Sequence, residues 1–384
     1  MGYLRETERR TDREGASAIM VDAPAIECGS VAGMHCVDRE RYALTREEIA
    51  AYADRLRLDV DSLMREHGVS LGALRTLQFA HLDRIAYETT GMHAGEEPPV
   101  LDPHESARRV AGGRGGYCFI IVDAYAALLT SLGFSVSLHV AAVAPEPVPR
   151  TKWGNHVLLV VHALDRSEDS EMEEGGEAMY VSDVGLGDGP RAPFRIAEGS
   201  WHELDGEEEI ITKSYRYSYA LSRRRGVRGA EWRFTHDRSG SFEGFTFRLS
   251  SSCTGAHEFL PYHEHLWMSP SSPFRRAGVV AQRVTANGVK LSLRNVAVRR
   301  VRPWPGRATS TVCDTMSWTD WSGHVEKLFL LRLEDTLSCD QQRRLWQLVC
   351  AKSGRCPGVR ARIRRWLRRA VLVVGLACFA KALR

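Results

Sequence analysis

Residues 114–119 read Arg-Gly-Gly-Tyr-Cys-Phe and lead into an apolar run that stops at Gly133. Two adjacent glycines let the backbone bend sharply just before the thiol of Cys118. The apolar run predicts a helix over residues 119–132, which places Cys118 at the helix N-terminus. There, unpaired backbone N–H groups and the positive end of the helix dipole favour a thiolate over a thiol. Cys118 is therefore a candidate nucleophile.

Length and composition are those of an ordinary globular protein. The chain has 384 residues, enough for two or three domains, and its net charge of +4 argues against nucleic acid as a partner. Its nine cysteines are an odd number and are scattered, which argues against a disulfide framework and for a reducing compartment. The spacing of Cys and His predicts no metal site. The first residues do not resemble a signal peptide, so we expect a cytoplasmic protein.

The hydrophobic pattern changes along the chain from a helical period to an alternating one. Thr45 and Glu48 predict a capped helix start, as do Asp102 and Pro103, and Leu71 opens another helical pattern. Ser338 and Gln341 predict the cap of a late helix that ends near residue 349. Beyond Gly133, strands are expected at residues 136–140, 156–161, 180–184, 244–249, 279–284 and 289–293, the last two joined by an Ala-Asn-Gly turn. Helices followed by many strands predict an α+β fold.

The last segment has a different composition. Arginines crowd around Trp366 over residues 360–369, and an apolar run follows over residues 370–380. That run is too short for an ordinary membrane span, which needs about 20 residues. A basic helix with a tryptophan fits weak contact with a membrane surface, and a partly disordered extension is the alternative.

A cysteine nucleophile needs a base to take its proton and a third group to orient that base. His156 begins the apolar run 156–161, and strand ends hold side chains rigidly. Asp183 lies in a second apolar run, where a carboxylate is costly unless it is paired. Pairing with Asp183 would fix the imidazole tautomer of His156. Spacing alone leaves the choice open, because the chain has fourteen histidines.

Further stretches, in order along the chain, extend the pattern. They are His-Leu-Asp-Arg-Ile-Ala-Tyr-Glu at 81–88, Asn-His-Val-Leu-Leu at 155–159, Asp-Val-Gly-Leu-Gly at 183–187 followed by Ala-Pro-Phe at 192–194, and Ser-Pro-Ser-Ser-Pro-Phe at 269–274. Together with residues 114–119 they resemble the arylamine N-acetyltransferases over roughly residues 43–350. The resemblance singles out Cys118, His156 and Asp183 as the catalytic triad.

The resemblance implies an N-terminal helical bundle, a middle antiparallel β-barrel and a C-terminal α/β lid around a cysteine-protease-like core. The expected divisions are a flexible arm at 1–41, the bundle with the nucleophile at 42–134, the barrel at 135–265, the lid at 266–350 and the basic, apolar extension at 351–384.

The resemblance also implies ping-pong acyl transfer and a part in xenobiotic metabolism. The Cys118 thiolate would attack acetyl-CoA, and an arylamine or hydrazine would then take the acetyl group. His156 would hold the thiolate and later accept the amine proton, and Asp183 would orient His156. Gly187 and Gly189 would let CoA approach the backbone, with a plain turn as the alternative. Acetyl-CoA is expected as a co-substrate, with no permanently bound cofactor; malonyl-CoA and propionyl-CoA remain alternative donors.

The chain departs from the family pattern in two places. The family usually has Glu, any residue and Asn after Cys-Phe, whereas residues 120–122 are Ile-Ile-Val. The family's Pro-Phe-Glu-Asn is Ala-Tyr-Glu-Thr at residues 86–89. We expect changes in packing or in the polar lining below the site, and we expect Arg114 to pair with Glu88 and hold the double-glycine turn. Two unrelated surface charges are the alternative for that pair.

Other functions fit parts of the pattern. A transglutaminase-like or papain-like cysteine hydrolase could use the same triad but would not explain the double-glycine segment or the downstream stretches. A non-catalytic relative could bind a membrane or a partner through its basic tail.

Overall fold

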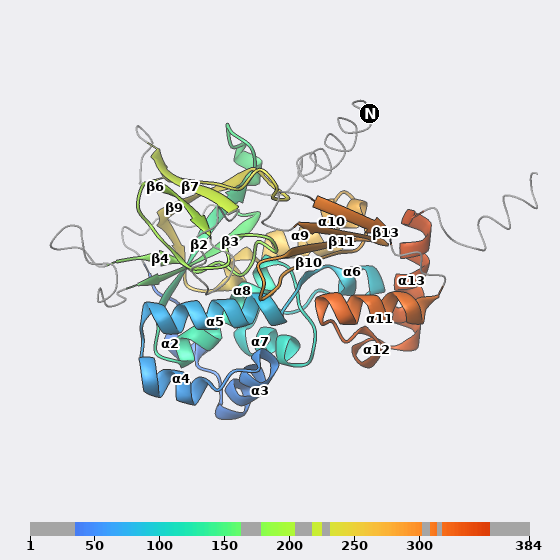
Figure 1. The fold of residues 1–384 in the computed structure, drawn as a ribbon, viewed down its shortest axis with the longest axis horizontal. Coiled ribbons are helices and arrows are strands. Elements are labelled where there is room, and N and C mark those ends of the chain that lie inside the picture. Colours follow the sequence, from blue (N-terminus) through green and yellow to red (C-terminus); the bar gives the residue numbers. More distant parts are fainter. Residues whose placement is uncertain are drawn as a thin grey trace, which may run out of the picture.

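The computed structural model describes residues 35–162, 178–203, 217–224, 231–301, 308–312 and 317–353. Helices of the first third lie below two antiparallel sheets, and three further helices lie beside the second sheet (Figure 1). The predicted α+β class is confirmed. Most of the expected arm and the tail beyond residue 353 lie outside the described residues.

The N-terminal helices begin where the capping signals predict. The Thr45 hydroxyl accepts from the Glu48 N–H, and the Glu48 carboxylate accepts from the Thr45 N–H, a capping box that opens α3. The Asp102 carboxylate caps α7. The last part of the expected arm packs on the body, since Val37 is buried and α2 begins at Arg39. The helices are α2 Arg39–Tyr42, α3 Arg46–Leu56, α4 Val60–His67, α5 Leu71–Arg84, α6 Thr90–Ala94, α7 Pro103–Ala111 and α8 Cys118–Ser131.

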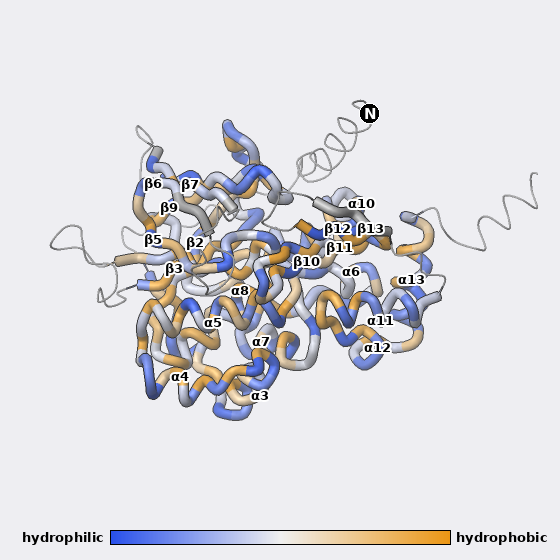
Figure 2. The backbone as a smooth tube through the Cα atoms, in the orientation of Figure 1, coloured by the Kyte–Doolittle hydropathy of each residue, from blue (hydrophilic) through white to orange (hydrophobic). Residues whose placement is uncertain are grey.

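Helix α8 forms the centre of the fold. All residues from Cys118 to Thr130 are buried, and the helix packs against α7 and strands β2 (Ser135–Val143) and β3 (His156–His162). Figure 2 shows α8, coloured by the hydropathy of its residues, among other hydrophobic segments. A helix that is apolar all round needs cover on every side, which explains why α8 is enclosed between helices and sheet.

Within the described residues, the larger sheet has eight antiparallel strands in the order β5-β4-β3-β2-β9-β8-β7-β6. The remaining strands are β4 Tyr180–Val181, β5 Phe194–Arg195, β6 Gly199–Glu203, β7 Tyr217–Arg224, β8 Glu231–Thr235 and β9 Gly244–Cys253. The strand expected at 180–184 is therefore shorter than predicted. After Val181, the Ser182 N–H still bonds to Leu159 O, and the Asp183 carboxylate then takes the N–H of Gly185, which turns the chain out of the sheet.

The second sheet has the order β1-β10-β11-β12-β13 and draws its first strand from the helical region. Strand β1 (Tyr87–Glu88) pairs with β10 (Val280–Val284). The hairpin predicted at the Ala-Asn-Gly turn joins β10 to β11 (Lys290–Arg294), with Gly288 at a φ of +69°. The other elements are η1 Arg150–Lys152, η2 Ala256–Phe259, α9 Leu260–Met268, α10 Pro273–Ala277, β12 Ala297–Val301, β13 Ala308–Val312, α11 Trp318–Phe329, α12 Leu333–Thr336 and α13 Cys339–Ser353.

Helices α11, α12 and α13 contribute apolar side chains to a core shared with β10, β11 and β12. The predicted cap of the late helix is present, because Ser338 and Gln341 exchange backbone and side-chain hydrogen bonds. Among the described residues, no helix is long and apolar enough to cross a membrane.

The burial of α8 predicts a large effect of a side-chain deletion at its centre. Leu129 is 0% exposed, so Leu129→Ala should lower the free energy of unfolding by about 2–5 kcal/mol. The matched control is Leu260→Ala, because Leu260 is 42% exposed and loses little packing. Urea denaturation measures both; equal effects of the two variants would contradict the central place of α8.

Candidate active site

The double-glycine turn is held by strand β1. Tyr87 and Gly116 form a parallel bridge, and the Glu88 N–H donates to Gly116 O at 3.0 Å. A Cβ on Gly115 would overlap the Ala86 carbonyl oxygen, and one on Gly116 would lie 2.7 Å from Cβ of Ile120. The glycines are therefore required by close packing, since neither has a positive φ.

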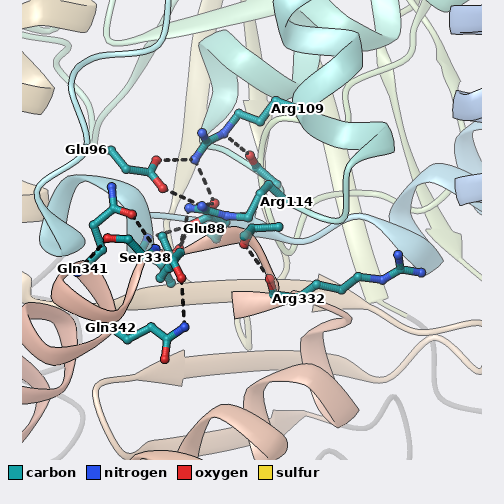
Figure 3. Close-up of polar contacts among 12 residues, drawn as sticks. Glu88, Glu96, Arg109, Arg114, Arg332, Ser338, Gln341 and Gln342 are labelled. Atoms are coloured by element: carbon teal, nitrogen blue, oxygen red, sulfur yellow. Dashed lines mark hydrogen bonds and ion pairs between the residues drawn. The ribbon is translucent and has the colours of Figure 1, made fainter. Parts of the chain in front are cut away.

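A network of ion pairs lies next to this turn (Figure 3). It consists of Glu88, Glu96, Arg109 and Arg114. The predicted pair is present: Arg114 Nη2 lies 3.4 Å from Glu88 Oε1. Glu96 bonds both Arg114, at 2.5 Å, and Arg109, at 3.1 Å, and Arg109 Nε donates to Gly115 O at 3.1 Å. Burial alone would raise the pKa of Glu88, but Arg114 and Arg109 lower it, so the carboxylate stays ionised.

His156 and Asp183 meet in the buried interior. His156 Nε2 lies 2.7 Å from Asp183 Oδ2, and the Asp183 Oδ1 accepts from the Gly185 N–H at 2.7 Å. Both residues are buried. Burial alone would lower the pKa of His156, but the Asp183 carboxylate, with a smaller effect of Cys118, raises it to about 10. The imidazole is therefore an imidazolium at neutral pH.

Cys118 lies at the start of α8, beside the residue that precedes His156. Its Sγ lies 4.0 Å from Asn155 O. The Asn155 side chain accepts from the Val143 N–H and donates to the Val143 carbonyl oxygen, which fixes the chain just before β3 begins. Because Asp183 takes Nε2 of His156, the ring presents Nδ1 as its second nitrogen. The structure thus brings the three predicted triad residues into one place; their catalytic roles remain a prediction.

Gly185 contacts the nucleophile directly. A Cβ on Gly185 would lie 3.1 Å from Cα and Cβ of Cys118 and 2.7 Å from Cγ2 of Val122. Gly187 has a φ of +74° and packs on Gln282, whereas Gly189 packs on Leu186. The turn conformation accounts for Gly187 without a ligand, and contact of Gly187 and Gly189 with CoA stays a prediction.

Two aromatic residues that the sequence did not identify as site residues, Tyr87 and Phe274, lie against the nucleophile segment, Tyr87 at Gly116 and Phe274 at Tyr117. Tyr87 contacts Phe274 edge-on, with ring centroids 6.3 Å apart. Burial raises the pKa of Tyr87, and a negative charge on Cys118 would raise it further. The signal in the sequence was the replacement of the family's Phe by Tyr in residues 86–89.

A cavity of about 230 Å³ lies elsewhere, and Cys118 does not line it. Its walls include Arg109, Glu97, Val100 and Ile120, so it borders the charged side chains that brace the turn. Among the described residues, no three His, Cys, Asp or Glu side chains form a group that could hold a metal ion.

The contact at Gly185 predicts that even one methyl group there disturbs the nucleophile. Gly185→Ala should slow alkylation of Cys118 by iodoacetamide roughly tenfold, because the added methyl group must displace Cys118. A cost of about 1.4 kcal/mol in the barrier corresponds to a tenfold lower rate. Adding Val122→Ala should restore part of the rate, because it removes one of the two crowded contacts. Labelling followed by mass spectrometry measures the rate; an unchanged rate in Gly185→Ala would contradict the packing.

The His156–Asp183 pair predicts a pH-dependent contribution to stability. The pKa of His156 is raised from 6.5 to about 10, so the folded state binds more protons between these values. The contribution is complete below about pH 6.5 and is lost as the pH rises through 10. Urea denaturation of wild type and Asp183→Asn should therefore show a difference in unfolding free energy at pH 7 that shrinks toward pH 10. A constant difference would contradict the ion pair.

Known proteins were compared with the chain by sequence and by structure. A family model described as N-acetyltransferase matches residues 70–336, which is more than half of the chain. No curated protein matches the sequence. Several solved structures share the fold, and their identity of 22% or less supports likeness of fold alone.

The arylamine N-acetyltransferase of Nocardia farcinica has a TM-score of 0.60 and 22% identity, over 80% of this chain and 96% of that one. The Salmonella typhimurium enzyme has the same TM-score and identity, over 80% and 100%. The Mycobacterium marinum enzyme, solved in complex with CoA, has a TM-score of 0.57 and 17% identity, over 78% and 99%. The predicted fold, an N-terminal helical bundle, a middle antiparallel β-barrel and a C-terminal α/β lid around a cysteine-protease-like core, is confirmed, with the barrel present as a curled antiparallel sheet. This chain belongs to the arylamine N-acetyltransferase family.

Proposed function

We propose that the protein is an acyl-CoA-dependent N-acyltransferase that moves an acetyl group from acetyl-CoA to an arylamine or hydrazine. The acyl group is carried as a thioester on Cys118 in a ping-pong reaction. The observation that carries this proposal is the buried His156–Asp183 hydrogen bond of 2.7 Å beside Cys118, in a chain of this family. Family membership supports the reaction class.

The first half-reaction forms the acyl-enzyme. The Cys118 thiolate attacks the thioester carbonyl, and the negative charge develops on the carbonyl oxygen. Tyr117, the N-cap of α8, makes no side-chain capping bond, and its carbonyl oxygen accepts from the N–H groups of Ile120 and Ile121. The N–H groups of Cys118 and Phe119 are therefore the ones that would meet that oxygen. The C–S bond to CoA breaks, and the His156 imidazolium supplies the proton to the departing sulfur.

The second half-reaction transfers the group. His156, now neutral, accepts a proton from the amine as its nitrogen attacks the acyl carbon. The Cys118 thiolate leaves, and the His156 imidazolium that results again pairs with it. Asp183 remains ionised and holds the ring through Nε2, so that Nδ1 faces the reacting atoms.

Finer features of the substrates follow from the surroundings of the thiol. We assign Tyr87 and Phe274, which are partly buried beside the nucleophile segment, to the side of the site that takes a flat aromatic acceptor. The crystal structure of the Mycobacterium marinum relative with CoA supports CoA as the donor's carrier. We assign Gly187 and Gly189 to the part of the site that binds CoA. The domain limits and the cytoplasmic location expected from the sequence are also part of this proposal.

The acyl-enzyme is tested directly by peptide mass mapping. After incubation with acetyl-CoA and no amine, the peptide containing Cys118 should gain one acetyl group, and addition of an arylamine should remove it. Cys118→Ala should abolish both the adduct and the release of CoA. The matched control, Cys339→Ala, removes an exposed cysteine and should react like wild type.

Release of CoA with an unmodified Cys118, or an adduct that persists in Cys118→Ala, would contradict the proposal. Loss of the acetyl group to water as fast as to any amine would instead favour a hydrolase. A panel of acetyl-CoA, malonyl-CoA and propionyl-CoA against several amines then identifies the donor and the acceptor class.

A further inference from the structure

We propose that Gln78 is a positioning residue that holds the loop of Asp183 against α5 and so keeps the orienting carboxylate in register with His156. The loop, residues 182–191, is called the acid loop below. The inference rests on the proposed triad, but it does not depend on which acyl donor or amine the enzyme uses.

Gln78 bonds both ends of the acid loop. Its Oε1 accepts a hydrogen bond from the Ser182 hydroxyl at 2.6 Å. Its Nε2 donates to Arg191 O at 3.0 Å and reaches Pro190 O at 3.4 Å. Carbonyl oxygens only accept, so the amide nitrogen faces Pro190 and Arg191 and the amide oxygen faces Ser182. One side chain therefore closes the loop across its base.

The first of these bonds lies one residue from the orienting carboxylate. Ser182 is fully buried, and its N–H is the last to bond strand β3, at Leu159 O. Asp183 then divides its two oxygens between His156 and the Gly185 N–H. A shift of Ser182 moves Asp183 with it, because the two share a peptide unit.

The second end of the loop is fixed by the neighbour of Gln78 on the same helix. The Arg191 guanidinium lies over the ring of Phe79, 4.3 Å from its centroid. Two adjacent residues of α5, Gln78 and Phe79, thus contact both the first and the last residue of the acid loop. Between these points lies Gly185, the glycine that packs on Cys118.

A merely structural role for Gln78 is the competing explanation, because any buried glutamine needs partners. Gln78 is 1% exposed, and leaving a buried polar group unpaired destabilises the folded state. Such a loss would lower stability without changing the acid–base behaviour of the site. If Gln78 positions Asp183, replacing it also weakens the Asp183–His156 bond. The weaker bond favours a neutral imidazole at neutral pH, which removes the positive charge beside Cys118.

The test compares the pH profile of Cys118 alkylation by iodoacetamide in folded variants, with thermal denaturation measured in parallel. Gln78→Met keeps the volume and removes the hydrogen bonds. It should move the midpoint of the profile to higher pH and lower the rate at pH 7 about three- to tenfold. Ser182→Ala removes the bond to Gln78 from the opposite side, together with the longer contact to the Tyr125 hydroxyl, and should act in the same direction. It also serves as the test if Gln78→Met fails to fold.

The matched control is Gln342→Met. Gln342 Nε2 also donates to two carbonyl oxygens, those of Glu334 and Leu337, but on α13. It should leave the alkylation profile unchanged. In an Asp183→Asn background, Gln78→Met should add no further shift, since the carboxylate it positions is already absent.

The outcomes separate this inference from the proposed function. If Asp183→Asn shifts the profile while Gln78→Met and Ser182→Ala lower only the melting temperature, the positioning role is overturned and the triad stands. If Asp183→Asn itself leaves the profile unchanged, the triad fails, and the positioning role fails with it. A further shift by Gln78→Met on top of Asp183→Asn would show that Gln78 acts by another route.

Discussion

The packing around Cys118 leaves no space for side chains at three glycines. Gly115 lies against the Ala86 carbonyl, Gly116 against Ile120, and Gly185 against the nucleophile itself. These contacts set the positions of strand β1, helix α8 and the acid loop relative to one another. Ile120, where the family usually has a polar residue, packs on one of the glycines, and Val122 packs on another. Two residues that depart from the family motif therefore take part in the packing around the thiol, and His156 and Asp183 still pair beside Cys118.

Charge supports this packing from two sides. Behind the turn, Arg109 and Arg114 share Glu88 and Glu96, so charges that would be costly alone are paired. Beside Cys118, the Asp183 carboxylate pairs with His156 and accepts a hydrogen bond from the Gly185 N–H. Removing one member of either arrangement leaves the remaining charge buried. Because an unpaired buried charge is costly, residues that do not touch Cys118 also influence its reactivity.

Local signals in the sequence predicted local structure well. The capping box at Thr45, the cap at Asp102 and the hairpin turn before Val289 depend on neighbours within a few residues, and all three are present. The pairing of β1 with β10 joins segments almost two hundred residues apart, and Gln78 bonds Ser182 across 104 positions. No local pattern encodes such contacts. The pairing of His156 with Asp183 was predictable because the family resemblance named both residues where spacing left the choice open. The strand expected at 180–184 was predicted too long, because the turn at Asp183 depends on a side-chain bond to Gly185.

The central claim is that Cys118 carries the acyl group before any amine binds. Rapid mixing of the enzyme with excess acetyl-CoA in the absence of acceptor measures it most directly, through the free CoA released. The account predicts a burst of one CoA for each active chain, followed by slow release as water hydrolyses the thioester. Release of CoA only after an arylamine is added would mean direct transfer within a ternary complex, and it would contradict the role given to Cys118.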